Sequence, residues 1–355
     1  MHRPRLLAIA ACAALAGCDC GGGFDPGRDP RKQDAGTVPL CSPPLVGSGV
    51  TLAGGLDGPR KLATDGTHLY FTEAGAPGTG RVSRVPLDSD GGAAVEELAT
   101  GFNTPDALAV DADYVYFLDE EGLWRVNKTT GQETRLDTLA SNALVGESAI
   151  RIHEQWLIIA TGLEYLVRIG KDGTGQILLY QAPPGATVTG VALEGTDVFF
   201  LVAGSGATAS AAGLYRVPVD GSSAATRVAS SPTLGRDLTV SPDAFLWTEG
   251  SAARDGAVRA LSRVDGGVTT YADQLWAPSS PVAVRGFVYF QARTDPSPSS
   301  PASELFLRMA AACDPLGAPV VGPSGYGPGD LLLHEGTLYF TSLGVAGQGH
   351  VGRLR

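Results

Sequence analysis

The stretch His68-Leu69-Tyr70-Phe71-Thr72-Glu73 contains the tripeptide that decides the fold, because similar tripeptides occur six more times along the chain. The seven copies are Leu69-Tyr70-Phe71, Val115-Tyr116-Phe117, Leu157-Ile158-Ile159, Val198-Phe199-Phe200, Phe245-Leu246-Trp247, Val288-Tyr289-Phe290 and Leu338-Tyr339-Phe340. Their middle residues are 46, 42, 41, 47, 43 and 50 positions apart. Each period is long enough for one small sheet, so the chain consists of seven similar units.

The first unit shows what each period contains. Lys61–Thr64 is expected to form a first strand, Asp65-Gly66 a hairpin turn and His68–Glu73 a second strand. Arg81–Leu87 and Val95–Ala99 follow as the third and fourth strands. The second strands are apolar at consecutive positions, which indicates burial on both faces. The sequence therefore predicts an all-β fold, a β-propeller of seven blades, with six or eight blades as alternatives.

The two ends of the repeat region complement each other. The last unit, from Asp330 to Arg355, supplies only three strands, while Gly49–Leu56 precedes the first unit as a single strand. Open terminal blades would expose apolar faces. We therefore expect the N-terminal strand to close the ring on the outer edge of the last blade.

An arginine recurs in the third strand of every unit. The seven are Arg84, Arg125, Arg168, Arg216, Arg263, Arg308 and Arg353. An arginine present in every unit is expected to be structural, with its stem packed and its guanidinium bonded to carbonyls or a carboxylate.

The unit resembles the Tyr-Trp-Thr-Asp-type repeats of receptor propellers and related bacterial propellers. Leu69-Tyr70-Phe71-Thr72-Glu73, followed by Gly80-Arg81, is the nearest match. The resemblance spans residues 50–355, but tryptophan occupies the second-strand position only at Trp247. It therefore implies an architecture and no particular receptor function.

The N-terminus has the zones of an export signal: basic Arg3 and Arg5, then an apolar run from Leu6 to Leu15. The following Leu15-Ala16-Gly17-Cys18 resembles the lipobox of bacterial lipoproteins. The resemblance implies cleavage before Cys18 and lipidation of that cysteine. Two or three acyl chains anchor a protein stably, so we expect membrane tethering without a spanning helix.

Three segments follow from these patterns: a signal peptide at 1–17, a flexible Gly- and Pro-rich linker at 18–44 and the propeller at 45–355. The expected location is the bacterial cell envelope, facing the periplasm or the cell surface. The net charge of -11 makes nucleic acid an unfavourable partner. The expected partners are the membrane, through the lipid anchor, and a protein or small polar ligand.

Five cysteines occur in the chain. Cys12 leaves with the signal peptide, Cys18 carries the lipid, and Cys20, Cys41 and Cys313 remain. A disulfide between Cys41 and Cys313 is favoured, because Cys41 lies just before the closing strand and Cys313 lies in the turn or fourth strand of the neighbouring sixth unit. The alternative is two free thiols. No closely spaced Cys/His group of zinc type is present.

Propellers place ligands at the mouth of the central channel, where the first strands begin. The polar residues at these positions are Arg60, Lys61, Asp106, Ser148, Thr189, Arg236, Asp237 and Asp330. Such a ring suits a polar ligand, although any solvated channel mouth is polar.

No nucleophile elbow, metal motif or cofactor motif stands out in the sequence. We therefore expect a non-catalytic binding or scaffold module tethered to a membrane. The alternative is a hydrolase or lyase with a metal in the channel held by Asp106, Asp237 and Asp330. The two hypotheses differ in whether these carboxylates converge or are paired with cations.

Overall fold

The structure is a computed structural model describing residues 49–137, 148–230, 235–250, 254–284, 287–293, 302–309, 319–326, 328–343 and 347–354. All of these residues belong to one of the two compact units of the chain, 38–355; the other unit is 1–37. The lipobox with Cys18, the linker, and the candidate disulfide of Cys41 and Cys313 lie outside the described residues.

Strands are the main secondary structure of the described chain, and five of its sheets have four antiparallel strands each. In chain order, the first two sheets contain β2 (Pro59–Thr64), β3 (His68–Glu73), β4 (Gly80–Pro86) and β5 (Glu96–Phe102), then β6 (Leu108–Val110), β7 (Tyr114–Asp119), β8 (Gly122–Asn127) and β9 (Glu133–Asp137). The next two contain β10 (Ala149–His153), β11 (Trp156–Ala160), β12 (Tyr165–Gly170) and β13 (Ile177–Gln181), then β14 (Thr187–Glu194), β15 (Asp197–Ala203), β16 (Gly213–Pro218) and β17 (Thr226–Ser230). The fifth has the order β1 (Val50–Leu56), β27 (Gly349–Leu354), β26 (Thr337–Ser342) and β25 (Pro328–His334).

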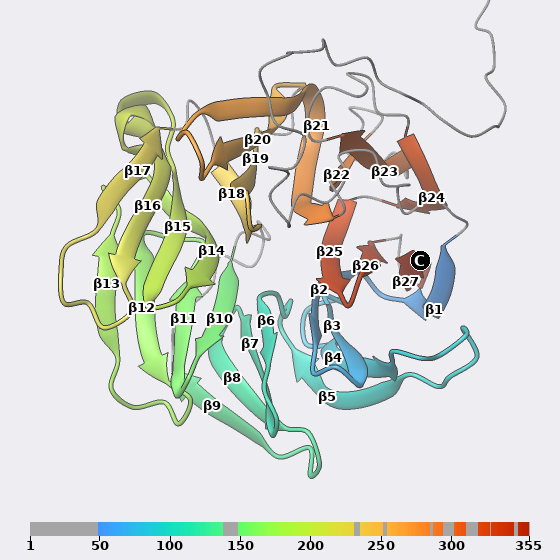
Figure 1. Ribbon diagram of the computed structural model, residues 1–355. Helices are drawn as coiled ribbons and strands as arrows, with labels where there is room; N and C mark the ends of the chain where they lie inside the picture. Colours follow the sequence, from blue (N-terminus) through green and yellow to red (C-terminus); the bar gives the residue numbers. More distant parts are fainter. Residues whose placement is uncertain are drawn as a thin grey trace, which may run out of the picture. The chain divides into compact units, whose positions relative to one another are not determined.

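The sixth sheet has seven strands. These are β18 (Gly235–Val240), β19 (Ala244–Glu249), β20 (Gly256–Ser262), β21 (Val268–Val284), β22 (Phe287–Arg293), β23 (Ala302–Met309) and β24 (Pro319–Tyr326). Figure 1 shows the six sheets around a common centre, each with one set of strands turned inward, which is the arrangement of a β-propeller.

The seven-stranded sheet corrects the predicted number of blades. The first part of β21, Val268–Leu275, pairs with β20, and the second part, Trp276–Val284, pairs with β22. Left-handed backbone at Gln274, Ala277 and Ser280 bends this strand without ending it. The prediction of seven separate blades is therefore wrong: two expected units share β21, and the described strands form six sheets, the number of the six-bladed alternative.

The seven apolar tripeptides occupy β3, β7, β11, β15, β19, β22 and β26, and every one of their residues is buried. Successive residues of one strand enter different cores. Leu69 and Phe71 pack with Val351 of the last sheet, whereas Tyr70 packs with Val115 and neighbouring residues of the next sheet. Burial of both strand faces between neighbouring sheets is confirmed, and it is the main apolar contribution to the fold.

The ring closes as the sequence predicts. Strand β1 pairs antiparallel with β27, from Val50 opposite Arg353 to Leu56 opposite Gly349. Leu52 is 1% exposed and belongs to the same core as Leu69. Residues from the beginning and end of the propeller therefore share one sheet and one core.

The third-strand arginines join neighbouring sheets. Arg125 donates to the Lys171 carbonyl at 3.0 Å and Arg168 donates to the Val219 carbonyl at 3.1 Å. Arg353, which is almost fully buried, donates to the carbonyl of Leu87. The structural role expected for these arginines is confirmed at these three positions.

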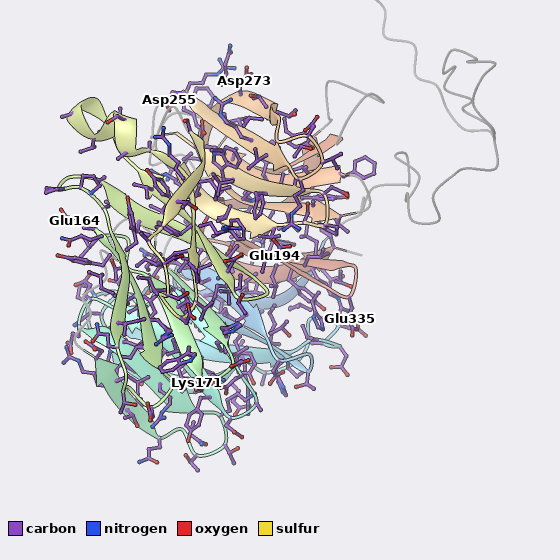
Figure 2. The ribbon with its side chains drawn as sticks, turned by 60° about the vertical axis from the view of Figure 1, so that its left-hand side comes forward. Glu164, Lys171, Glu194, Asp255, Asp273 and Glu335 are labelled. Atoms are coloured by element: carbon purple, nitrogen blue, oxygen red, sulfur yellow. The ribbon has the colours of Figure 1, made fainter. Side chains whose placement is uncertain are left out.

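Ion pairs add further links between sheets. Lys171 pairs with Asp111 at 2.8 Å, and Glu194 pairs with Arg263 at 2.6 Å. Lys171 directly follows β12, and Glu194 is the last residue of β14; both are labelled in Figure 2.

The loop after β15 contains a short 3-10 helix, η2 (Gly206–Ala211). Among the residues that the structure describes, no helix is long and apolar enough to cross a membrane.

Candidate ligand site in the central channel

The inner strands enclose a cavity of about 520 Å³ at the centre of the ring. Its walls are formed by β2, β6, β10, β14, β18, β25 and the second part of β21. This volume falls within the range of small-molecule sites. The cavity lies where the sequence placed the candidate ligand site.

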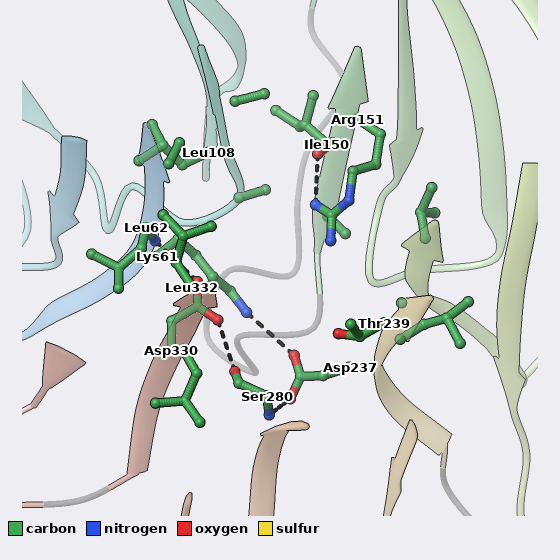
Figure 3. Close-up of a pocket in the computed structure, with 18 of the residues that line it drawn as sticks. Lys61, Leu62, Leu108, Ile150, Arg151, Asp237, Thr239, Ser280, Asp330 and Leu332 are labelled. Carbon is green, nitrogen blue, oxygen red and sulfur yellow. Dashed lines mark hydrogen bonds and ion pairs between the residues drawn. The ribbon is translucent and has the colours of Figure 1, made fainter. Parts of the chain in front are cut away.

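Four residues from four different strands form a connected polar network on one side of the cavity. Nζ of Lys61 on β2 lies 3.5 Å from Oδ1 of Asp237 on β18. The Ser280 amide on β21 donates to Oδ2 of Asp237 at 2.9 Å, and its hydroxyl donates to Oδ1 of Asp330 on β25 at 2.7 Å. Figure 3 shows these side chains converging on one wall of the pocket.

The network also includes one backbone group. The amide of Leu62 donates to Oδ2 of Asp330 at 3.0 Å, so both oxygens of this carboxylate accept hydrogen bonds. The protein itself therefore supplies donors to both carboxylates of this wall.

Burial and charge act against each other on the ionisable groups of the cavity. Burial lowers the pKa of Lys61, but the carboxylates of Asp237 and Asp330 outweigh it and the pKa of Lys61 is raised. Burial raises the pKa of Asp330, and the charge of Lys61 offsets only part of that effect. Lys61 is therefore cationic at neutral pH, and its charge stabilises the ionised form of Asp330.

The opposite side of the cavity carries a second cation, Arg151 on β10. Its side chain is exposed to the channel, and Nη1 donates to the carbonyl of Ile150 at 2.8 Å. Figure 3 shows Arg151 and Thr239 directed into the pocket from the side that faces Lys61 and Asp330. Burial lowers the pKa of Arg151, and the charges of Asp330 and Asp237 offset part of this effect.

The structure brings together some of the predicted mouth residues and separates others. Lys61, Asp237, Asp330 and Ser148 line the cavity. The other four predicted residues, Arg60, Asp106, Thr189 and Arg236, are not part of its wall.

Two of the displaced residues have structural roles instead. Asp106 is completely buried and accepts a hydrogen bond of 2.7 Å from the hydroxyl of Ser148. The hydroxyl of Thr189 donates to the Gly235 carbonyl at 2.9 Å. Both contacts connect neighbouring inner strands.

The three aspartates of the alternative metal site are not arranged as metal ligands. Asp106 lies in the protein interior with Ser148, whereas Asp237 is paired with Lys61 and Asp330 is held by Ser280. In the part of the chain that the structure describes, no group of three or more His, Cys, Asp or Glu side chains is placed to hold a metal ion.

Sequence reasoning missed Arg151, Thr239 and Ser280. Arg151 and Thr239 lie two positions beyond Ala149 and Asp237, which occupy the mouth position of their strands. Alternation along a strand returns the side chain to the same face after two residues, so this spacing was the available signal.

No protein-family model and no curated protein matches this sequence. Solved structures do match its fold. The extracellular domain of the one-component system BT4673 from B. thetaiotaomicron has a TM-score of 0.59 at 8% identity, over 86% of this chain and 39% of that chain.

Two other solved structures cover most of both chains. Oligogalacturonate lyase from Vibrio parahaemolyticus has a TM-score of 0.53 at 13% identity, over 85% of this chain and 90% of that one. BamB from Moraxella catarrhalis has a TM-score of 0.50 at 14% identity, over 85% of this chain and 84% of that one. At these identities the similarity shows the propeller fold alone.

Proposed function

We propose that this protein is a lipid-anchored propeller of the bacterial cell envelope that binds a small polar ligand in its central channel without transforming it. The lipid on Cys18 holds the propeller at a membrane, facing the periplasm or the cell surface. The propeller provides the binding site, and the linker separates the two.

The polar network of Lys61, Asp237, Ser280 and Asp330 is the observation that carries the proposal. These side chains come from four strands and meet in one cavity of about 520 Å³. A rigid ring that positions polar groups in a cavity is the arrangement expected of a ligand site. Because both carboxylates already accept hydrogen bonds, the network favours recognition of a ligand over metal-assisted chemistry.

The anchor is tested by changing two cysteines that lie two residues apart. Cys18→Ala removes the acylated side chain, so the protein is expected to leave the membrane fraction and to lose labelling by a radioactive or clickable palmitate. Cys20→Ala is the matched control and should stay in the membrane fraction. Retention of the Cys18→Ala protein in the membrane would refute the anchor.

The channel is tested with the full-length protein solubilised in detergent. A mixture of polar metabolites is incubated with the protein, and bound compounds are identified by mass spectrometry after release. We expect a compound to be retained and recovered chemically unchanged. Asp237→Asn should weaken this retention, since it removes one carboxylate from the cavity wall. Recovery of a cleaved product would instead favour the hydrolase or lyase alternative.

A further inference from the structure

Seven structurally equivalent positions lie on the inner strands, each directly opposite the middle residue of an apolar tripeptide. They are occupied by Ala63, Ala109, Arg151, Ala192, Thr239, Val282 and Leu332. Six of the seven side chains are uncharged, and Arg151 is the charged one. Because the other units fold without an arginine at this position, Arg151 is not required by the repeated structure, in contrast to the third-strand arginines.

Arg151 has no counterion in direct contact among the described residues. The hydrogen bond that Arg151 forms with the residues that the structure describes goes to the carbonyl of Ile150, which is a neutral acceptor. A guanidinium has five N–H donors, so most of its donors are available to a molecule in the cavity. The carboxylates of Asp237 and Asp330 act on it electrostatically across the cavity without a hydrogen bond.

The charges of the cavity are distributed unevenly. Lys61 is paired with Asp237, and Asp330 is hydrogen-bonded by Ser280 and the amide of Leu62. Within the described part of the chain, Arg151 remains as a cation with no carboxylate in direct contact. A cation placed in a protein cavity is stabilised most by an anion that it contacts directly.

The planar shape of the Arg151 guanidinium determines which kind of anion it binds best. The planar fork of a guanidinium matches a carboxylate through two parallel hydrogen bonds, and this pairing is stronger than hydrogen bonding between neutral groups. The wall facing Arg151 presents the opposite chemistry, since Asp237 and Asp330 accept hydrogen bonds there. A ligand that spans the cavity therefore needs an acid group at one end and hydrogen-bond donors at the other.

We propose that the channel binds a small organic carboxylate whose acid group pairs with Arg151 and whose hydroxyl or amino groups face Asp237 and Asp330. The cavity of about 520 Å³ suits a molecule of the size of a sugar acid or a dipeptide. This inference rests on the proposed function, because it names the class of ligand that the same channel takes.

The test uses the full-length, detergent-solubilised protein and a defined mixture of matched probes. Each acid is accompanied by a partner that lacks the carboxylate charge: D-glucuronate with D-glucose, L-alanine with L-alaninamide, and glycylglycine with glycylglycinamide. Retained compounds are identified by mass spectrometry, and their affinity is measured by calorimetry. We expect retention of carboxylates only, and the retained member shows whether hydroxyl or amino donors face the aspartates.

Arg151→Leu is expected to weaken binding of the retained acid by roughly tenfold to a hundredfold, the usual effect of losing a hydrogen-bonded charge. Arg151→Lys keeps the charge but not the fork, and should retain an intermediate affinity. Arg227→Leu, on the outer strand β17, is the matched control and should bind like the wild-type protein. Thermal unfolding of each variant shows that the protein remains folded.

The outcomes separate this inference from the proposed function. Retention of neutral compounds, or equal affinity of the Arg151→Leu and wild-type proteins for the acid, overturns the inference and leaves the proposed function in place. Retention of no compound from the mixture counts against both. Retention of acids that depends on Arg151 supports both.

Discussion

The sheet junctions and the central channel both contain lysine–aspartate pairs, but the two regions satisfy them differently. At the junction of the first two sheets, Asp65 accepts hydrogen bonds of 2.7 Å from Lys128 and 2.7 Å from the hydroxyl of Tyr70. The backbone amides of Thr67 and His68 donate to the same carboxylate. Although burial raises the pKa of Asp65, these donors hold it well below its usual range.

The next junction repeats this arrangement. Asp111 accepts from Lys171 through an ion pair of 2.8 Å and from the hydroxyl of Tyr116 at 3.1 Å. Burial raises the pKa of Asp111, but the hydrogen bond from Lys171 and those from backbone amides outweigh it. The repeat of aspartate, tyrosine and lysine therefore joins each of these sheets to the next.

In the channel, burial has a larger effect on the aspartate pKa than the donors and cations do. The pKa of Asp330 is raised because burial outweighs its donors and the charge of Lys61. The Lys61 to Asp237 distance of 3.5 Å is also longer than the junction pairs. At the junctions the protein supplies enough donors and positive charge to keep the aspartate ionised. In the channel the stabilisation of Asp330 is incomplete, and a ligand with hydrogen-bond donors can add to it.

The largest expected effect is at the first junction. Asp65→Ala removes the acceptor of five donors, since the hydroxyl of Thr67 also donates to this carboxylate. We therefore expect a loss of about 2–3 kcal/mol in the free energy of unfolding. A depressed carboxyl pKa contributes stability above the unfolded-state value of about 3.9, and this contribution is lost as the pH falls. Because the pKa of the folded carboxyl lies well below its usual range, this carboxyl stays ionised at pH 3.5. Denaturant unfolding should therefore show a large difference from wild type at pH 7 and only a modestly smaller difference at pH 3.5.

Asp172→Ala is the control for that experiment. Asp172 accepts from Thr174 within its own turn and, among the described residues, forms no ion pair with a neighbouring sheet, so its loss should cost clearly less. Equal destabilisation by the two variants would show that the turn, and not the junction, explains the effect.

The two junction lysines rank next. Lys128→Met and Lys171→Met should each destabilise the protein by about 1–2 kcal/mol, because each leaves a partly buried carboxylate without its cation. The Lys128 side chain is 10% exposed and that of Lys171 is 27% exposed, so the effect should be larger at Lys128. Chemical denaturation at low salt measures both, and the reverse order would contradict the ranking by burial.

Lys61→Met is expected to have a smaller effect, about 1 kcal/mol at pH 7, because the Lys61–Asp237 distance of 3.5 Å is longer than that of the junction pairs. Without Lys61 the pKa of Asp330 should rise further. A raised carboxyl pKa contributes stability that is present below the unfolded value and is lost as the pH rises through the folded value. The destabilisation should therefore shrink when unfolding is measured at pH 4 instead of pH 7.

Arg151→Leu should change stability least, by less than about 0.5 kcal/mol, because its guanidinium has one neutral hydrogen-bond partner and no ion pair in the described chain. Thermal or chemical unfolding without ligand checks this expectation. A loss comparable to that of Lys128→Met would mean that Arg151 is structural, which would remove the contrast between channel and junctions.

Much of the fold was predictable because its signals are local. The second strand at His68–Glu73 agrees with β3, and the closing strand expected at Gly49–Leu56 agrees with β1 at Val50–Leu56. Consecutive apolar residues, hairpin turns and a missing fourth strand can all be seen within or between single repeats. The continuity of β21 was not predictable, because it depends on backbone bends at Gln274 and Ala277 that no glycine or repeat signal marks.

The candidate site was predictable only in part. Lys61, Asp237 and Asp330 were placed at the channel correctly, but Asp106 and Thr189 are buried between strands. The repeat locates the channel end of each inner strand, but it does not show which side chains there bond to the neighbouring segment, as Asp106 and Thr189 do, instead of facing the cavity.

The sequence alone determined that the chain repeats an apolar strand seven times and that a strand from its beginning completes its last sheet. These features depend on spacing and burial pattern, which are properties of short segments. Only the tertiary structure decided that Lys61 meets Asp237, 176 residues away, and that Arg151 faces them with no directly bonded counterion among the described residues. Ring closure brings these distant positions together, and the geometry of a closed ring cannot be derived from any one of its repeats.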